Sequence, residues 1–215
     1  MSKAIAVMGE SGSGKTTAMR TLDPATTYYI DCDLKGLSWR GWREQYSSEK
    51  KNFFQTRDLG KIGSVMVGIS EKRPDIKTIV VDTLNTAMVD KEVRGMGDSS
   101  GYGKWIDLAQ FVWEICCTAS KLRDDMAVII VMHSETIRDD LGYSITRIKT
   151  NGRKLEKLVL ESLFSTVLLC KSKEDGSHVF ETRAINSTAK TPLDAFDTDE
   201  IPNDMKAVLD VLNEY

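Results

Sequence analysis

The sequence predicts an α/β protein with a mostly parallel, twisted sheet flanked by helices and an antiparallel hairpin near the C-terminus. Apolar, strand-like runs alternate with helical segments over residues 4–132, an order typical of parallel sheets with right-handed crossovers. A glycine-rich turn follows the first of these runs. Two later segments of strand character, 165–172 and 177–185, flank Asp175-Gly176, a dipeptide that favours a tight hairpin turn.

Length and composition indicate one globular domain. The chain has 215 residues, a net charge of −3 and 41% hydrophobic residues, so we expect residues 1–215 to fold as a single soluble domain. No apolar run approaches the ~20 residues that cross a bilayer, so we expect no membrane partner and a cytoplasmic location. The four cysteines contain no C-x-x-C pair, and the chain has two histidines, a pattern that argues against a zinc site.

The N-terminal elements follow from their residues in order. Residues 4–8 are all apolar, as expected for a strand buried on both faces. A helix is predicted over 15–22, since Asp23-Pro24 would end it. Thr27–Asp31 is rich in aromatic and β-branched residues and predicts the second strand. Thr78–Asp82 is continuously apolar up to its last residue and predicts the third.

The later elements alternate in the same way. Residues 127–132 predict a fourth buried strand that ends at His133. Glycine and serine dominate 95–103, and polar residues run over 134–152, so both segments are predicted as loops. Apolar residues at helical spacing predict helices at 59–70, 83–94, 104–122 and 153–163, and a short one opened by Pro202 within the C-terminal tail 190–215.

The strongest functional signal is the segment Gly9-Glu10-Ser11-Gly12-Ser13-Gly14-Lys15-Thr16-Thr17, which follows the first strand and opens the first helix. Backbone N–H groups of such a loop can surround an anion, and the helix directs its positive end to the same place. Lys15 is expected to reach the β- and γ-phosphates, and the Thr16 hydroxyl to ligate Mg²⁺. We therefore predict that residues 9–17 form a phosphate-binding loop (P-loop) that holds ATP with Mg²⁺.

Acidic residues at the ends of the second and third strands are candidates for the metal ligand and the catalytic base. Asp82 ends the third strand, where its carboxylate could hold Mg²⁺ opposite Thr16. The next residue is Thr83, whereas many ATPase motors carry their water-activating Glu there. Asp31 or Asp33 could instead polarise the attacking water, and the sequence leaves the choice open. In the alternative interpretation, both carboxylates cap the following turn.

His133 closes the fourth strand. If that strand lies between the first and the third, a polar residue here would lie beside the γ-phosphate. It could then report ATP or ADP to the segment that follows. A structural role at the strand end is the alternative.

With these motifs in this order, the chain resembles the RecA-like P-loop ATPases. More narrowly, it resembles the small phage-encoded RecA-core proteins assigned to single-strand annealing and recombination, the fourth Sak type. The resemblance spans nearly the whole chain and matches Asp33 to the acidic residue that closes strand two. It matches His133 to the γ-phosphate-sensing Gln of RecA. Residues 94–101 are similar to the first DNA-binding loop of RecA, and 151–155 to the segment after the second.

The resemblance also implies an oligomer. Segment 181–192 resembles the strand pair that carries trans-acting cations toward a neighbouring subunit's nucleotide. Lys190 is the favoured cation and Arg183 the weaker one, since Pro192 stands where related helicases often have an arginine. Because the first predicted strand lies at the start of the given sequence, we expect no counterpart of the N-terminal segment through which RecA polymerises. The family implies a ring or filament with nucleotide at subunit interfaces, in an infected bacterial host, with a phage single-strand-binding protein as a further partner.

Local patches favour single-stranded DNA despite the acidic net charge. Cations neutralise phosphates, and aromatic rings stack on exposed bases without requiring a sequence. The alternative is a solvated helix start and a flexible loop. The predicted DNA-binding residues are Tyr102 and Lys104 beside loop 95–103, and Arg138, Tyr143, Arg147, Lys149, Arg153 and Lys154 in and after loop 134–152.

The sequence thus predicts an ATP-dependent single-stranded-DNA-binding protein that acts in phage recombination or annealing. Its Mg²⁺-dependent ATPase is expected to be slow and stimulated by DNA. A nucleotide-gated scaffold, similar to a helicase loader, remains an alternative because Glu is missing after Asp82. A small nucleotide kinase is a further alternative, although Asp82-Thr83-Leu84-Asn85 offers no acceptor-binding arginine.

Overall fold

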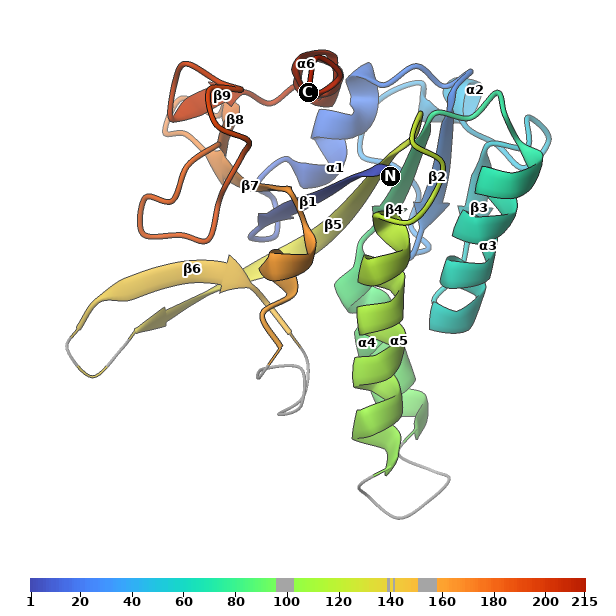
Figure 1. Cartoon of the computed structure of the whole chain (residues 1–215), viewed down its shortest axis with the longest axis horizontal. Coiled ribbons are helices and arrows are strands. Elements are labelled where there is room, and N and C mark those ends of the chain that lie inside the picture. Colours follow the sequence, from blue (N-terminus) through green and yellow to red (C-terminus); the bar gives the residue numbers. More distant parts are fainter. Residues whose placement is uncertain (96–102, 139, 141, 151–157) are drawn as a thin grey trace.

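The structure of the chain, a computed structural model, is one sheet with helices packed on its faces (Figure 1). Its termini lie near each other on the upper side of the molecule in the view of Figure 1. Among the described residues, no helix is long and apolar enough to cross a membrane. The structure describes residues 1–95, 103–138, 140, 142–150 and 158–215, without the side chains of 95 and 103–107.

The sheet is mostly parallel, as predicted. Across it the strands follow the order β3-β2-β4-β5-β1-β7-β8-β9, and β6 pairs with β5 outside this path. Strands β3 to β7 along this path run parallel, whereas β8 and β9 are antiparallel additions at one edge. The strands are β1 Lys3–Gly9, β2 Thr27–Asp31, β3 Phe53–Gln55, β4 Thr78–Asp82, β5 Ala127–Arg138, β6 Ser144–Ile148, β7 Thr166–Ser172, β8 His178–Glu181 and β9 Glu200–Pro202.

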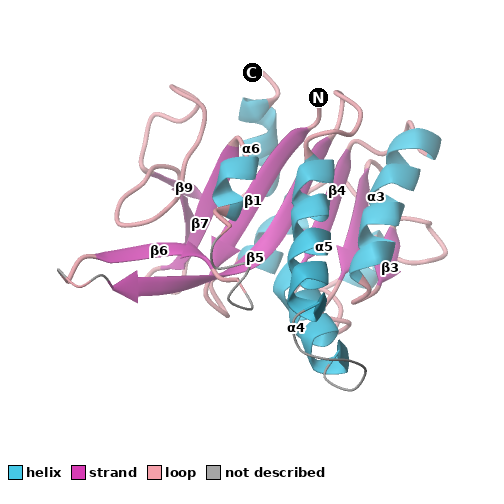
Figure 2. Cartoon of the chain, turned by 60° about the horizontal axis from the view of Figure 1, so that its bottom comes forward, coloured by secondary structure: helices cyan, strands magenta, loops and turns pink. Residues whose placement is uncertain are grey.

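Two apolar cores cover the two faces of the sheet, because successive residues of a strand point to opposite sides. In β1, Ala4, Ala6 and Met8 belong to the core beneath α3, α4 and α5, which Figure 2 shows across one face. Ile5 and Val7 belong to the other core, with η1 and α6. The helices are α1 Lys15–Ala18, η1 Met19–Thr21, α2 Trp42–Gln45, α3 Leu59–Lys72, α4 Leu84–Gly95, α5 Gly103–Ala119, η3 Leu160–Leu163 and α6 Met205–Leu212.

The strand order brings the predicted functional residues to one edge. β5 lies between β1 and β4, the condition under which His133 was expected beside the γ-phosphate. His133 is in register with Gly9 of the P-loop, and Asp82 is in register with Asp31. The carboxyl ends of parallel strands form the ligand-binding edge of such a sheet.

The main difference from the sequence prediction is a β-ribbon in place of the loop predicted over 134–152. Residues Ser134–Arg138 continue β5 beyond the sheet and pair antiparallel with β6, so the ribbon projects from the body of the molecule (Figures 1 and 2). β5 is buried as far as Met132 and increasingly exposed after it. Since none of residues Ser134–Arg138 is buried, this stretch lacks the hydrophobic alternation from which strands are predicted.

Smaller corrections concern the ends of elements. The helix predicted over 15–22 is split into α1 and η1, and β8 ends at Glu181 although strand character was predicted to 185. Pro202 belongs to β9, and α6 instead begins after Asp204, whose carboxylate accepts a hydrogen bond from Ala207 N at 3.1 Å. The short elements α2 and β3 were not predicted. Most of loop 95–103 and residues 153–157 of the predicted helix 153–163 lie outside the described part of the chain.

The base of the ribbon is anchored to a later segment. Thr146 N donates to Asn186 O at 2.8 Å, and Thr188 N donates to Thr146 O at 2.9 Å. The buried carboxylate of Glu161 accepts from Ile148 N at 2.9 Å and from the Thr188 hydroxyl at 3.0 Å. Glu161 therefore joins the end of β6 to the segment that leads toward Lys190.

Replacing Glu161 tests this anchor. Glu161→Ala removes the acceptor of one buried and one half-buried donor, and the free energy of unfolding should fall by about 3 kcal/mol. Glu161→Gln keeps one side-chain oxygen and should cost less. Urea unfolding measures both, with exposed Glu174→Ala as control. A Glu161→Ala variant as stable as Glu174→Ala would contradict the anchoring role.

Candidate nucleotide-binding site

The P-loop has the backbone that its glycines predict. Gly14, the N-cap of α1, has φ of +94°, a conformation that side-chain-bearing residues rarely adopt. A Cβ at Gly14 would lie 2.6 Å from the ring of His178. At Gly9 a Cβ would lie 2.5 Å from Ser13 Oγ and 2.7 Å from Cys170 O. The loop is therefore closely packed between the end of β1 and strands β7 and β8.

Lys15 lies over this loop and is largely buried. Its ammonium donates to Gly9 O at 2.8 Å and to Glu10 O at 2.6 Å. Burial lowers the pKa of Lys15, while the nearby Asp82, Cys170 and Asp33 side chains oppose that shift. A partly desolvated cation at this place is well suited to bind the terminal phosphates of a nucleotide.

Asp82 is the buried acid of the site. Its carboxylate accepts hydrogen bonds from Tyr29 Oη at 2.5 Å and from Thr83 Oγ1 at 2.8 Å. Burial raises the pKa of Asp82, and hydrogen bonds from Tyr29, Thr16 and Thr83 oppose the shift. Tyr29 is itself held edge-on against Trp39 and Tyr46.

Thr16 and Asp82 fit the magnesium ion that ATP would carry. A hydroxyl and a carboxylate are the hard oxygen ligands that Mg²⁺ accepts, and Mg²⁺ in phosphate sites usually has few protein ligands. Within the described part of the chain, no group of three or more His, Cys, Asp or Glu residues could form a cage for a metal ion. The site therefore suits an ion that is held mainly by phosphates and water.

The two acids that follow β2 have different surroundings. Asp31 is 2% exposed, and its carboxylate accepts from the backbone N–H groups of residues 33, 34 and 36 and from Gln55 Nε2. Three of these donors belong to the turn after β2, and Gln55 comes from β3. β2 ends at Asp31, so Asp33 lies beyond the strand, and the alternation of side chains along a strand does not relate the two acids.

Asp33 interacts with three other ionisable side chains, those of Lys35, Lys15 and His133. Its carboxylate accepts a hydrogen bond from Thr86 Oγ1 and forms an ion pair with Lys35. Burial raises the pKa of Asp33, but Lys35 and Thr86 outweigh it, and the net shift is downward. Asp33 also acts electrostatically on Lys15 and His133. Asp33 therefore interacts with Lys15 of the P-loop and with His133 of β5, the neighbours expected of a base beside the γ-phosphate.

His133 is held in place through its backbone. Its N–H donates to Asn85 Oδ1 at 2.7 Å, and Asn85 Nδ2 donates to Lys149 O at 2.8 Å. Asn85 thus joins α4, β5 and the end of the ribbon, a role that the sequence did not indicate. Burial and the Lys15 ammonium lower the pKa of His133, and Asp33 opposes them. The imidazole is therefore neutral at neutral pH.

On the side of the P-loop next to β7 and β8 lie residues that were not predicted from the sequence. The His178 ring lies against Gly14, and its Nδ1 is 3.1 Å from Ser172 Oγ. The Cys170 thiol donates to Ser13 O at 2.8 Å, and burial raises its pKa to about 11. The Asp175-Gly176 turn signal was the available clue, because the hairpin it predicts carries both His178 and Cys170.

The other residues predicted from the sequence lie away from the P-loop or outside the described residues. Tyr102, Arg153 and Lys154 are not described, nor is the side chain of Lys104. Arg138, Tyr143, Arg147 and Lys149 all lie on or just after the ribbon. Lys190 pairs through its backbone with Val167, and no hydrogen bond or ion pair among the described residues joins its side chain to the P-loop.

Comparisons with known proteins agree with this arrangement at the level of the family. A family model described as an AAA domain matches residues 1–193 of the 215-residue chain. No curated protein matches the chain.

The lowered pKa of His133 predicts a pH dependence of stability. The unfolded chain, with a histidine pKa near ~6.5, binds more protons than the folded one as the pH falls. Wild type should therefore lose stability as the pH falls from that value through the folded-state pKa. His133→Gln lacks this titration and should lose less stability over the same range. Urea unfolding between pH 8 and pH 5 compares them, and identical pH dependence would contradict the assignment.

Proposed function

This chain belongs to the AAA-domain family of nucleotide-binding ATPases, and from that premise we propose that it binds single-stranded DNA under the control of ATP and acts in phage DNA recombination or annealing. One observation carries the proposal. A single strand, β5, bears His133 at the nucleotide edge and continues without interruption to Arg138 on the projecting ribbon.

ATP is expected to bind with its phosphates in the P-loop. Lys15, now bonded to two loop carbonyls, would exchange them for phosphate oxygens. Mg²⁺, held beside Thr16 and Asp82, would neutralise charge on the phosphates. Asp33 is charged at neutral pH because its pKa is low, so it can accept a hydrogen bond from the attacking water and orient it.

The neutral imidazole of His133 would sense the terminal phosphate. A contact made with ATP and lost with ADP would bias the position of β5. The ribbon that continues β5 exposes Arg138 and Tyr143 near its tip, and Arg147 and Lys149 lie on the returning side. Such cations and aromatic rings bind the phosphates and bases of a single strand without sequence preference.

A nucleotide-gated scaffold with very slow turnover is the second candidate. Two observations favour it: Thr83 stands where a catalytic Glu would follow Asp82, and the Asp33 carboxylate is engaged by Lys35 and Thr86. The two candidates differ in whether Asp33 is needed for the protein to act.

Two substitutions test the nucleotide chemistry. Lys15→Ala should abolish ATP binding, measured by titration with a fluorescent ATP analogue. Asp33→Asn should retain binding but lower the rate of hydrolysis by about 10²–10⁴-fold, the usual contribution of a general base. For the wild type, an oligo(dT) strand should increase the rate. DNA binding would be refuted by a rate of ATP hydrolysis that is the same with and without oligo(dT), together with no binding of the labelled strand. An Asp33→Asn variant as fast as wild type would refute the assignment of the base.

The position of His178 predicts where the nucleoside binds. The terminal phosphates are expected on the side of the P-loop that contains Asp82, Asp33 and His133. The nucleoside should therefore lie on the other side, near β7 and β8. Stacking of the base on the His178 ring is worth about 1–3 kcal/mol. His178→Ala should therefore weaken ADP binding about tenfold while leaving inorganic tripolyphosphate binding within about twofold, both by calorimetry. Equal losses for the two ligands would contradict a contact with the base.

A further inference from the structure

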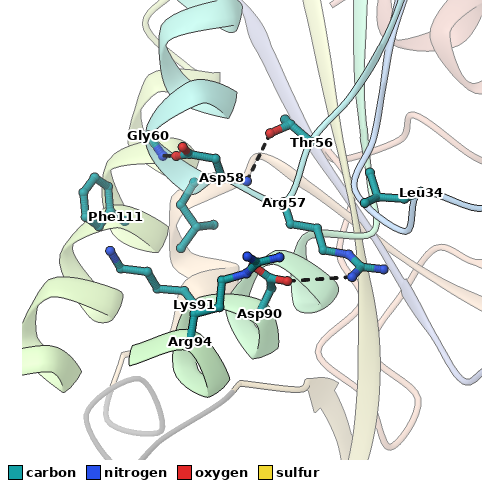
Figure 3. Close-up of a pocket in the computed structure, with 10 residues that line it drawn as sticks. Leu34, Thr56, Arg57, Asp58, Gly60, Asp90, Lys91, Arg94 and Phe111 are labelled. Atoms are coloured by element: carbon teal, nitrogen blue, oxygen red, sulfur yellow. Dashed lines mark hydrogen bonds and ion pairs between the residues drawn. The ribbon is translucent and has the colours of Figure 1, made fainter. Parts of the chain in front are cut away.

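A pocket of about 590 Å³ lies between the loop after β2 and the helices α3, α4 and α5 (Figure 3). Three cations line it, Arg57, Lys91 and Arg94, together with the acids Asp58 and Asp90. None of these residues belongs to the P-loop or to the ribbon, and only Arg94 belongs to a segment, 94–101, that the sequence matched to a DNA-binding loop.

The acids of the pocket leave part of its positive charge uncompensated. Asp58 accepts from the backbone N–H groups at the start of α3. Asp90 lies between the two arginines, 2.6 Å from Arg94 Nε and 3.7 Å from a terminal nitrogen of Arg57. Lys91 has no carboxylate partner among the described residues, and its ammonium lies 5.1 Å above the ring of Phe111.

The cations are also accessible. The Arg94 side chain is 77% exposed and that of Arg57 35% exposed, while Lys91 is exposed as well. Arginine presents several N–H donors in a planar fork that matches two oxygens of a phosphate. An anion that enters this pocket would therefore meet the N–H donors of two arginines, Arg57 and Arg94. Both arginines pair with the same carboxylate, that of Asp90.

The pocket is connected to the candidate base. Arg57 donates to Cys32 O at 3.3 Å and to Asp33 O at 3.0 Å, so it holds the backbone that carries the Asp33 carboxylate. On the other side, Thr86 donates to that carboxylate. Thr86 and Asp90 lie one turn apart on α4. Arg57 and α4 thus both contact the pocket and Asp33.

We propose that this pocket binds a backbone phosphate of single-stranded DNA, and that Arg57 transmits the binding to Asp33. The inference rests on the proposed function. The phosphate pairs with Lys91 and Arg94 and competes with Asp90 for the arginines. Release of Asp90 then changes how Arg57 holds the backbone at Asp33, which makes Arg57 a positioning residue for hydrolysis.

Loss of single cations tests the binding site. Lys91→Ala and Arg94→Ala should each weaken binding of fluorescein-labelled oligo(dT) about fivefold near 0.1 M salt and reduce the slope of log affinity against log salt by about 0.7. Lys206→Ala is the matched control, because Lys206 forms the same i,i+4 ion pair with Asp210 on α6, which belongs to the other core. Arg94→Lys keeps the charge and should restore affinity to within about twofold of wild type, which would separate loss of charge from loss of fold.

A second variant tests transmission. Arg57→Lys retains a positive charge for the phosphate but loses the fork that reaches both Cys32 O and Asp33 O. It should bind oligo(dT) within about twofold of wild type yet lose most of the DNA stimulation of ATP hydrolysis. Stimulation at the wild-type level would refute the role of Arg57.

The outcomes distinguish failure of the proposed function from failure of the phosphate pocket. If wild type binds no oligo(dT), the proposed function fails and the pocket fails with it. If wild type binds and the Lys91 and Arg94 variants match Lys206→Ala, the pocket alone is refuted. Stimulation of hydrolysis by inorganic phosphate alone, at matched ionic strength, would assign the pocket to a free anion and overturn the DNA assignment.

Discussion

The position of β5 between β1 and β4 is the constraint on which the site depends. A parallel sheet brings the carboxyl ends of its strands to one edge, and the strand order decides which of those ends are neighbours. Here the order sets His133 in register with Gly9 at the start of the P-loop, while β4 and β2 bring Asp82 and Asp31 together one strand further on. With β5 at an outer position, the same residues would lie too far apart to contact one nucleotide.

The acids at this edge are kept distinct by their hydrogen bonds. Asp31 is saturated by donors of its own turn, Asp82 is buried beneath Tyr29 and Thr83, and Asp33 is paired with Lys35. Asp82 and Asp33 thereby differ in their tendency to hold a proton: the pKa is raised at Asp82 and lowered at Asp33. Asp31 thus caps its turn, and under the proposed function Asp82 would hold the metal ion and Asp33 would act as the base, because the environments of the three carboxylates differ.

The parallel sheet, the P-loop and Asp82 could be predicted from the sequence, because buried strands are continuously apolar and phosphate loops need glycines at fixed spacing. The ribbon could not, since Ser134–Arg138 has no buried face to impose an alternating pattern. The sequence also left Asp31 and Asp33 as equal alternatives, because the choice depends on where β2 ends and on Gln55, which comes from a short strand that was not predicted. Contacts between distant segments, such as His178 on Gly14 and Asn85 on His133, have no local signature at all.

The continuity of β5 has a mechanical consequence. Arg138 lies five residue steps beyond His133, a span of roughly 17 Å at ~3.3 Å per residue. A rigid tilt of a few degrees about the sheet edge would thus displace the far end of β5 by about an ångström. Coupling through such a tilt is reciprocal. The free energy by which one ligand favours binding of the other must equal the free energy by which the second favours binding of the first. Under the proposed function, a strand bound to the ribbon would change the affinity for ATP by the same factor by which ATP changes the affinity for the strand.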